Sequence, residues 1–236
     1  MPSEVTLYII ATPIGNLEDI TLRAIRILGE VDILACEDTR RTKILLDRHN
    51  IPAPRRIISY REENEKISAP GIIKLLEQGN SVAVCSDAGY PGISDAGYRL
   101  ISEAVEKGVG IVVVPGASAV PVALLSSGLP TDSYVFLGFL PRKPGARRRS
   151  LEMEKDLPHT LVIYESPLRL SKVLEAALEV LGDRRAAVCI ELTKMFEETH
   201  RGYLSDLIKQ FVDRKVKGEV TIVIAGNNPK FIRTEP

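Results

Sequence analysis

The first half of the chain alternates short apolar runs with amphipathic stretches. The runs are short enough to be buried strands, and they lie at residues 5–12, 32–37, 56–59, 81–86 and 110–114. Between them, helical stripes at residues 22–28 and 72–76 end at Gly29 and Gly79, since glycine is a common helix stop. This alternation predicts an α/β fold whose mostly parallel sheet is covered on both faces.

The second half has a different rhythm. Strand-like runs lie at residues 134–138, 160–164, 186–191, 196–202 and 219–226, and helical patterns at 147–155, 167–181 and 205–215. Ser166 and Pro167 are typical of a helix start, as N-cap and first helical residue. The strand signals on either side of Lys194 have no helix between them, which predicts a hairpin and a mixed sheet. We place the domain boundary at the Pro-Gly turn, giving domains 1–116 and 117–236.

The glycine-rich segment at residues 86–97 carries the strongest functional signal. It leaves a predicted strand for a helix, the position at which open α/β sheets hold ligands. Its small residues let the backbone approach a ligand closely. Asp87, in place of a basic residue, favours a hydroxyl-bearing or cationic ligand over a bare phosphate. The alternative is a tight turn in which Asp95 is the helix N-cap.

Three further loops follow predicted strands, at residues 11–16, 37–41 and 115–119. Loops at the carboxyl edge of one parallel sheet lie side by side, so together they predict a pocket. A dinucleotide site is disfavoured. Glu37 follows Gly15 by 22 positions (37 − 15), close to the expected spacing, but the fingerprint lacks its other glycines and Pro13 removes a backbone donor.

Composition and charge narrow the class of protein. The 44% hydrophobic content excludes global disorder, and the balance of 31 basic and 31 acidic residues does not by itself indicate a nucleic-acid partner. No apolar run approaches the roughly 18 residues of a membrane helix, and no signal peptide is visible, so we expect a cytoplasmic protein. Cys36, Cys85 and Cys189 fit small buried hydrophobes, and neither the cysteines nor the histidines have the spacing of a metal site.

Two basic clusters flank the predicted loops. One lies at residues 40–43 and the other at 142–149. A phosphate backbone needs such side chains, whereas a solvated surface is the alternative interpretation. Phe136 and Phe139 precede the second cluster, where they either stack a base or belong to the core.

Eight blocks of sequence occur in a recognisable order, at residues 11–17, 37–40, 86–97, 115–119, 127–132, 138–141, 164–167 and 191–194. Together they resemble the ribosomal RNA small subunit methyltransferase I family, within the tetrapyrrole methylase superfamily. The resemblance runs from about residue 5 to residue 226, and so many ordered blocks make it specific.

The resemblance implies a two-domain tetrapyrrole methylase-like fold, with a Rossmann-like amino-terminal sheet and a mixed carboxy-terminal sheet. It implies S-adenosylmethionine in the cleft between the domains, and 2′-O-methylation of a cytidine in 16S ribosomal RNA, within the assembled small subunit, by a homodimer. Carried over by position, the expected cofactor contacts are Pro13, Asp87, Tyr90, Ala117, Ser118, Tyr164, Leu192 and Ala225. With an RNA substrate, the expected phosphate contacts are Arg40, Arg41, Arg142, Lys143, Arg147, Arg148 and Arg149.

The chain departs from the pattern of the family at four positions. Tyr90 stands in place of threonine, Ala96 of proline, Leu168 of histidine and Ile190 of arginine. The last two changes remove side chains that could contact RNA or a second subunit.

The base that would remove the hydroxyl proton is left open by the sequence. Lys194, Glu165 and Glu37 are candidates, and a lysine would need its pKa lowered by burial or neighbouring cations. Two alternative functions also stay open, a methylase of a small tetrapyrrole and a non-catalytic RNA-binding assembly factor. The arginine clusters favour RNA over a small substrate.

Overall fold

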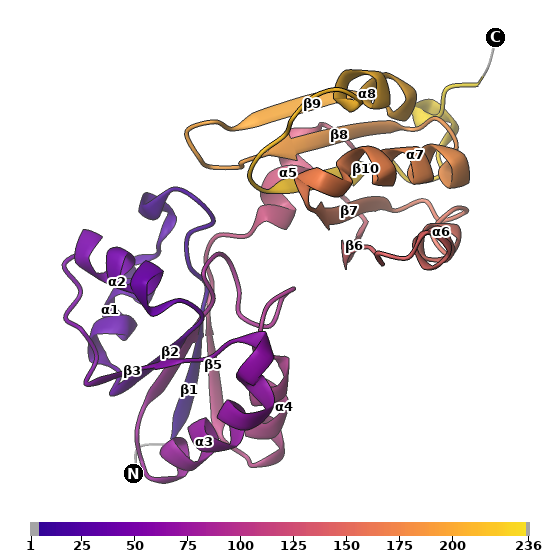
Figure 1. Ribbon diagram of the computed structural model, residues 1–236. Helices are drawn as coiled ribbons and strands as arrows, with labels where there is room; N and C mark the ends of the chain where they lie inside the picture. The colour runs from indigo at the N-terminus through magenta and orange to yellow at the C-terminus, as the bar shows by residue number, and fades with distance from the viewer. Residues whose placement is uncertain (1–4, 235–236) are drawn as a thin grey trace. The chain divides into compact units, whose positions relative to one another are not determined.

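The computed structural model describes residues 5–234 and divides into two compact units, Met1–Ser118 and Ala119–Pro236 (Figure 1). Each unit contains one five-stranded sheet. None of the helices within the described residues has the length and apolar character needed to cross a bilayer.

The sheet of the first unit is parallel throughout, in the order β3-β2-β4-β1-β5. Its strands are β1 (Thr6–Ile10), β2 (Ile33–Cys36), β3 (Arg56–Ser59), β4 (Val82–Cys85) and β5 (Gly110–Val114). The α-helices between them are α1 (Leu22–Glu30), α2 (Thr39–Arg48), α3 (Glu65–Glu77) and α4 (Tyr98–Glu106).

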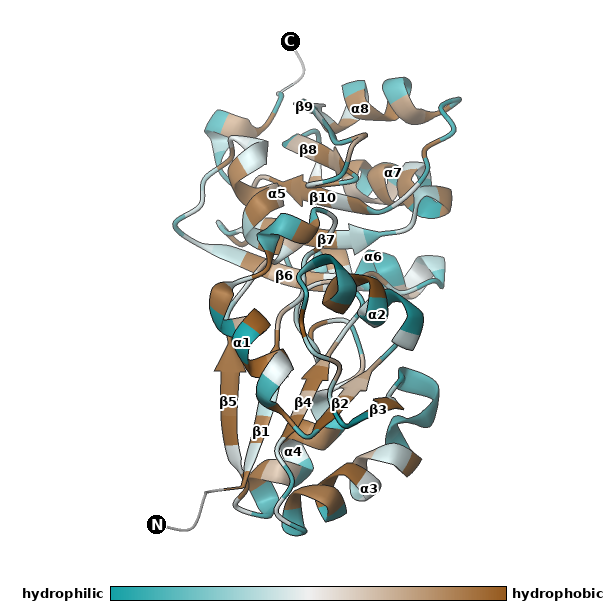
Figure 2. Cartoon of the chain, turned by 90° about the vertical axis from the view of Figure 1, so that its left-hand side faces the viewer, coloured by the Kyte–Doolittle hydropathy of each residue, from teal (hydrophilic) through white to brown (hydrophobic). Residues whose placement is uncertain are grey.

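Alternate side chains of these strands enter two different cores, because successive residues of a strand point to opposite faces. In β4, Val82 and Val84 pack with α3 and α4, whereas Ala83 and Cys85 pack with α1 and α2. The sheet is therefore covered on both faces, as the sequence predicts. Figure 2 shows the strands as mainly hydrophobic and much of α2 as hydrophilic.

The second unit contains a mixed sheet in the order β6-β7-β10-β8-β9, in which only β6 and β7 are parallel. Its strands are β6 (Tyr134–Phe139), β7 (Thr160–Glu165), β8 (Arg185–Ile190), β9 (Glu198–Tyr203) and β10 (Val220–Ile224). Its α-helices are α5 (Ala119–Ser127), α6 (Pro144–Glu152), α7 (Leu170–Leu181) and α8 (Leu204–Phe211). The predicted hairpin around Lys194 is confirmed as the antiparallel pair β8 and β9.

Helices α6, α7 and α8 share one core with the sheet of the second unit. Leu151, Leu174 and Phe211 are members of that core, one from each helix. Helix α5 also packs against β8 and β10, but none of its residues belongs to this core. The second unit is therefore also a sheet with helices on both faces.

One local prediction and one alternative are wrong, and another prediction is confirmed in part. Residues 37–41 are not all loop, because Asp38 accepts the Arg40 N–H at 2.9 Å and α2 begins at Thr39. Ser166 and Pro167 are confirmed as N-cap and first helical residue, but of a 3-10 turn, Pro167–Arg169, that precedes α7, and Ser166 makes no side-chain cap hydrogen bond. Asp95 does not cap α4, whose N-cap residue is Gly97.

Candidate functional site

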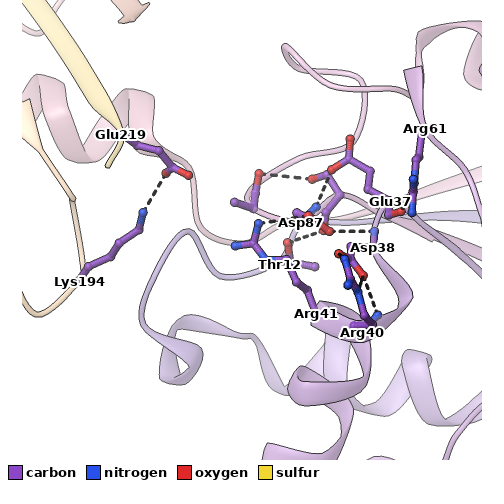
Figure 3. Close-up of polar contacts among 11 residues, drawn as sticks. Thr12, Glu37, Asp38, Arg40, Arg41, Arg61, Asp87, Lys194 and Glu219 are labelled. Carbon is purple, nitrogen blue, oxygen red and sulfur yellow. Dashed lines mark hydrogen bonds and ion pairs between the residues drawn. The ribbon is translucent and has the colours of Figure 1, made fainter. Parts of the chain in front are cut away.

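Asp87 and the turn after β2 are held together by two reciprocal hydrogen bonds. Cys36 and Cys85 pair in register at the ends of β2 and β4, so the residues that follow them are neighbours. The Asp87 N–H donates to Glu37 Oε2 at 2.9 Å, and the Asp38 N–H donates to Asp87 Oδ1 at 3.1 Å (Figure 3). Two loops that the sequence expects at one sheet edge are therefore joined directly.

Charged side chains surround this pair of loops. Arg41 reaches Asp87 Oδ2 at 3.1 Å, and Arg40 binds Asp38 through Nε at 3.0 Å and Nη2 at 2.7 Å. The Arg40 hydrogen bonds hold the pKa of the Asp38 carboxyl well below its usual range. Burial raises the pKa of the Glu37 carboxyl, and the hydrogen bond from Asp87 only partly offsets that rise. The adjacent residues Glu37 and Asp38 thus carry carboxyl groups of unequal acidity.

The loop after β1 joins the same edge through a short backbone bridge. The Thr12 N–H donates to Gly89 O at 2.9 Å, and the Gly89 N–H donates to Thr12 O at 3.0 Å. Gly89 has φ of +81°, a conformation that glycine adopts at no steric cost. Pro13, the next residue, is buried. The bridge therefore fixes the glycine-rich loop beside the first loop.

Tyr90 connects the glycine-rich loop to the loop after β5. Its hydroxyl accepts the Gly116 N–H at 3.0 Å. A Cβ at Gly116 would lie 3.0 Å from Ala11 Cβ, so this loop crosses the end of β1 closely. Ala117 and Ser118 follow and are half-buried. All four predicted loops thus meet at one edge of the first unit's sheet, with five of the expected cofactor residues.

The other three expected cofactor residues lie in the second unit. Tyr164, the penultimate residue of β7, is half-buried, while Leu192 and Ala225 are buried. Leu192 stands between Glu191 and Thr193, whose φ values are +52° and +65°. Leu192 is 6% exposed, whereas Ala225 is fully buried and its N–H donates to Arg185 O at 2.9 Å.

The three candidates for a base have different surroundings. Lys194 pairs with Glu191 at 2.7 Å and Glu219 at 3.2 Å. Burial opposes its charge, but these carboxylates outweigh it and raise the pKa of the ammonium, the opposite of what a base requires. Glu165 is buried, and burial raises the pKa of its carboxyl. Glu37, half-buried, is the third.

Six of the seven predicted RNA contacts are exposed. Arg40 and Arg41 lie in the first turn of α2, and Arg142, Lys143, Arg148 and Arg149 lie on or just before α6. Arg147 differs, because only 7% of it is exposed and its Nη1 reaches Arg142 O at 3.5 Å. The row of arginines is therefore not one solvated face.

Arg61 is a site residue that the sequence analysis did not include. It follows β3, and its Nε donates to Glu37 O at 2.8 Å. The sequence did carry a signal for Arg61, because it follows the strand at 56–59, which belongs to the same parallel sheet and also ends at its carboxyl edge.

The sequence matches the family described as Tetrapyrrole (Corrin/Porphyrin) Methylases over residues 6–208. Two solved structures are similar across almost the whole chain. A cobalt precorrin-4 methyltransferase superposes with a TM-score of 0.66 at 18% identity, covering 95% of this chain and 96% of that one. A uroporphyrin-III-C-methyltransferase from Thermus thermophilus gives 0.64 at 21% identity, covering 92% and 93%. At these identities the similarity establishes the fold.

Curated relatives are much closer in sequence. The chain is 46% identical to ribosomal RNA small subunit methyltransferase I of Halalkalibacterium halodurans over 95% of this chain and 77% of that protein. It is 44% identical to the protein of the same name from Thermotoga maritima, over 93% and 98%. For that of Bacillus subtilis the identity is 42% over 97% and 78%. The chain therefore belongs to the ribosomal RNA small subunit methyltransferase I family of tetrapyrrole methylases.

Proposed function

We propose that this chain uses S-adenosylmethionine to methylate the 2′-oxygen of a cytidine in small-subunit ribosomal RNA. The observation that carries the proposal is the breadth of the similarity to proteins named for that RNA, at 42–46% identity over more than nine-tenths of the chain. The family resemblance of the eight ordered blocks supports the ribose 2′-oxygen of a cytidine as the target.

The carboxylate acceptors at the first unit's sheet edge suit S-adenosylmethionine. The cofactor carries hydroxyl and amino donors and a positive sulfonium, and carboxylate oxygens accept from such groups. Asp87 accepts one backbone N–H on Oδ1, and its Oδ2 accepts from the exposed side chain of Arg41. We assign the cofactor to the eight residues named by the resemblance.

The cofactor supplies a methyl group that its sulfonium already activates. The task of the chain is then to hold the ribose hydroxyl in line with that methyl, at about 3 Å. A base works best when its pKa lies near the operating pH, so the raised pKa of Glu37 supports it over Lys194. Glu165 is only 2% exposed and is held by Arg169, which supports a structural role for it.

Asp87→Asn tests the cofactor assignment. Asparagine keeps an oxygen for the Asp38 N–H but removes the charge, so the turn is retained. Loss of a charge-assisted contact should weaken S-adenosylmethionine binding by roughly 10- to 100-fold in calorimetric titration. Asp95→Asn, in the same loop but exposed, is the matched control and should bind normally. Undiminished binding by Asp87→Asn would remove Asp87 from the cofactor site.

Transfer of tritiated methyl to isolated small ribosomal subunits tests the substrate. We expect label in RNA, recovered after digestion as 2′-O-methylcytidine. Cofactor binding with label only in an added tetrapyrrole would favour the small-molecule methylase, and no cofactor binding would favour an assembly factor.

We also propose that the protein is a homodimer that acts on the assembled small subunit in the cytoplasm. Light scattering of the purified protein measures the mass of the particle and so tests the dimer directly.

A further inference from the structure

Phe139 ends an edge strand of the second unit with most of its ring uncovered. Strand β6 lies at the edge of the sheet, paired only to β7. Phe139 is 56% exposed, whereas Leu140 beside it is buried. One side of the ring contacts Tyr164, with centroids 5.9 Å apart and planes at 65°. Burial in the core, the simpler of the two roles left open by the sequence, therefore does not apply to Phe139.

A β-bulge gives Phe139 this position. Phe136 pairs with Val162, but the register then shifts so that Gly138 pairs with Ile163 and Phe139 with Tyr164. The extra residue reverses the alternation, so Phe136 and Phe139 share the sheet face of Tyr164. Phe136 contacts the same tyrosine at 4.7 Å. Bulges often re-aim a side chain at a functional site, and here one aims an aromatic ring outward.

Buried charges fix the backbone directly after Phe139. Arg169 Nη2 donates to Leu140 O at 2.6 Å and lies 3.0 Å from Glu165 Oε2. Glu165 in turn accepts the Ser166 N–H at 2.8 Å. Arg147 reaches Arg142 O at 3.5 Å. A buried carboxylate and two guanidinium groups thus hold residues 140–142, so Phe139 is presented from a rigid segment.

The stretch of chain that contains Phe139 is strongly basic. Residues 133–151 contain Arg142, Lys143 and three further arginines and no acidic residue. Arg148 pairs with Glu179 at 2.6 Å, whereas Arg142, Lys143 and Arg149 form no ion pair with the residues that the structure describes. An exposed ring followed three and four residues later by the unpaired cations Arg142 and Lys143 suits a base attached to a phosphate backbone, since single-stranded nucleic acids bind by stacking and by charge.

We propose that Phe139 is a stacking platform for an unstacked nucleobase of the RNA substrate, with Arg142 and Lys143 binding the adjoining phosphates. The inference rests on the proposed function and adds a base-binding residue to it. RNA readers commonly hold splayed bases on exposed aromatic rings. A protein partner would have no need of the cations, and the cofactor adenine is the other source of a nucleobase.

The chain contains no tryptophan, which gives a direct spectroscopic test. Phe139→Trp places the sole indole on the platform, and Tyr134→Trp places one at the exposed opposite end of β6. Titrated with a single-stranded oligocytidylate decamer, Phe139→Trp fluorescence should be quenched and Tyr134→Trp fluorescence should not. Equal behaviour of the two variants overturns the proposal. Quenching of Phe139→Trp by S-adenosylhomocysteine alone assigns the platform to the cofactor instead.

Kinetics with small ribosomal subunits separate this inference from the proposed function. Phe139→Ala should raise the KM for subunits roughly tenfold or more, with kcat and cofactor affinity unchanged, and Phe139→Tyr should restore it. An unchanged KM in Phe139→Ala, with active wild-type protein, overturns the inference alone. Absence of methyl transfer by the wild-type protein overturns the proposed function and, with it, the RNA assignment of Phe139.

Discussion

Arg184 is a buried charged residue that links three segments of the second unit by hydrogen bonds. It is 2% exposed, its Nε donates to Leu181 O at 2.9 Å and its Nη1 to Ala225 O at 3.4 Å. Its Nη2 donates to Lys155 O. One guanidinium therefore joins the end of α7, the end of β10 and the segment after α6. Burial lowers the pKa of this group, but three carbonyl acceptors suit its charged form.

Arg184→Met should destabilise the protein strongly. The methionine fills the space but leaves two buried carbonyls, Leu181 O and Ala225 O, and the partly buried Lys155 O without this donor. At about 1–3 kcal/mol for each buried group, we expect a loss of about 3 kcal/mol or more. Urea denaturation followed by circular dichroism measures it. Arg26→Met is the control, because Arg26 forms an exposed pair with Glu30 and should cost under about 1 kcal/mol. Equal losses in the two variants would contradict the bridging role of Arg184.

Adjacent arginines show what the sequence could not decide at this scale. Arg184 and Arg185 occupy the same polar stretch, yet the first is buried and the second exposed. The same holds for Arg147 among exposed Arg148 and Arg149. The sequence does not show which arginine is buried, because some of the acceptors, such as Lys155 O and Ala225 O for Arg184, come from distant segments. The place of Asp87 just after a strand, in contrast, was predictable, since a glycine-rich strand end is a local signal.

At the scale of elements, the glycine-rich loop and α4 are capped from a distance. Glu65 Oε1, at the start of α3, accepts the N–H groups of Gly97 and Arg99, both at 3.0 Å. It also accepts the hydroxyl of buried Tyr60 at 2.9 Å. Asp95 was the local candidate for this cap, but the donors are satisfied by a carboxylate 32 residues away from Gly97. Strand positions followed from local periodicity, whereas this cap depends on the tertiary fold.

Gly97→Ala should disrupt the glycine-rich loop, at which we propose that the cofactor binds. Gly97 has φ of +150°, and an added Cβ would lie 2.5 Å from Gly92 N, so the loop must move. We expect a stability loss above about 2 kcal/mol from strain and collision together, and weaker S-adenosylmethionine binding. Gly108→Ala, at the other end of α4, carries φ of +68° but meets nothing within 4 Å. It should cost only the backbone strain, about 1–2 kcal/mol, and bind the cofactor normally.

At the scale of the whole molecule, the positive and negative charges are equal in number but unevenly distributed. The chain has 31 basic and 31 acidic residues, so no overall positive field attracts RNA. Some exposed cations are already paired, such as Arg26 with Glu30, Arg48 with Glu18 and Lys107 with Glu77. We therefore expect the salt dependence of RNA binding to report local groups of unpaired cations, such as Arg142, Lys143 and Arg149, rather than the net charge.

Neutralising two equal sets of three cations separates local from net charge. Replacing Arg142, Lys143 and Arg149 by glutamine should lower the slope of log affinity against log salt by about 2, since each phosphate contact on a single strand contributes about 0.7. Replacing Arg26, Arg48 and Lys107 by glutamine changes the net charge equally, yet should leave the slope almost unchanged because those cations are paired. Anisotropy of a labelled oligocytidylate across a salt series measures both slopes. Equal slopes in the two variants would mean that net charge governs binding, and would remove the segment before and on α6 from the RNA interface.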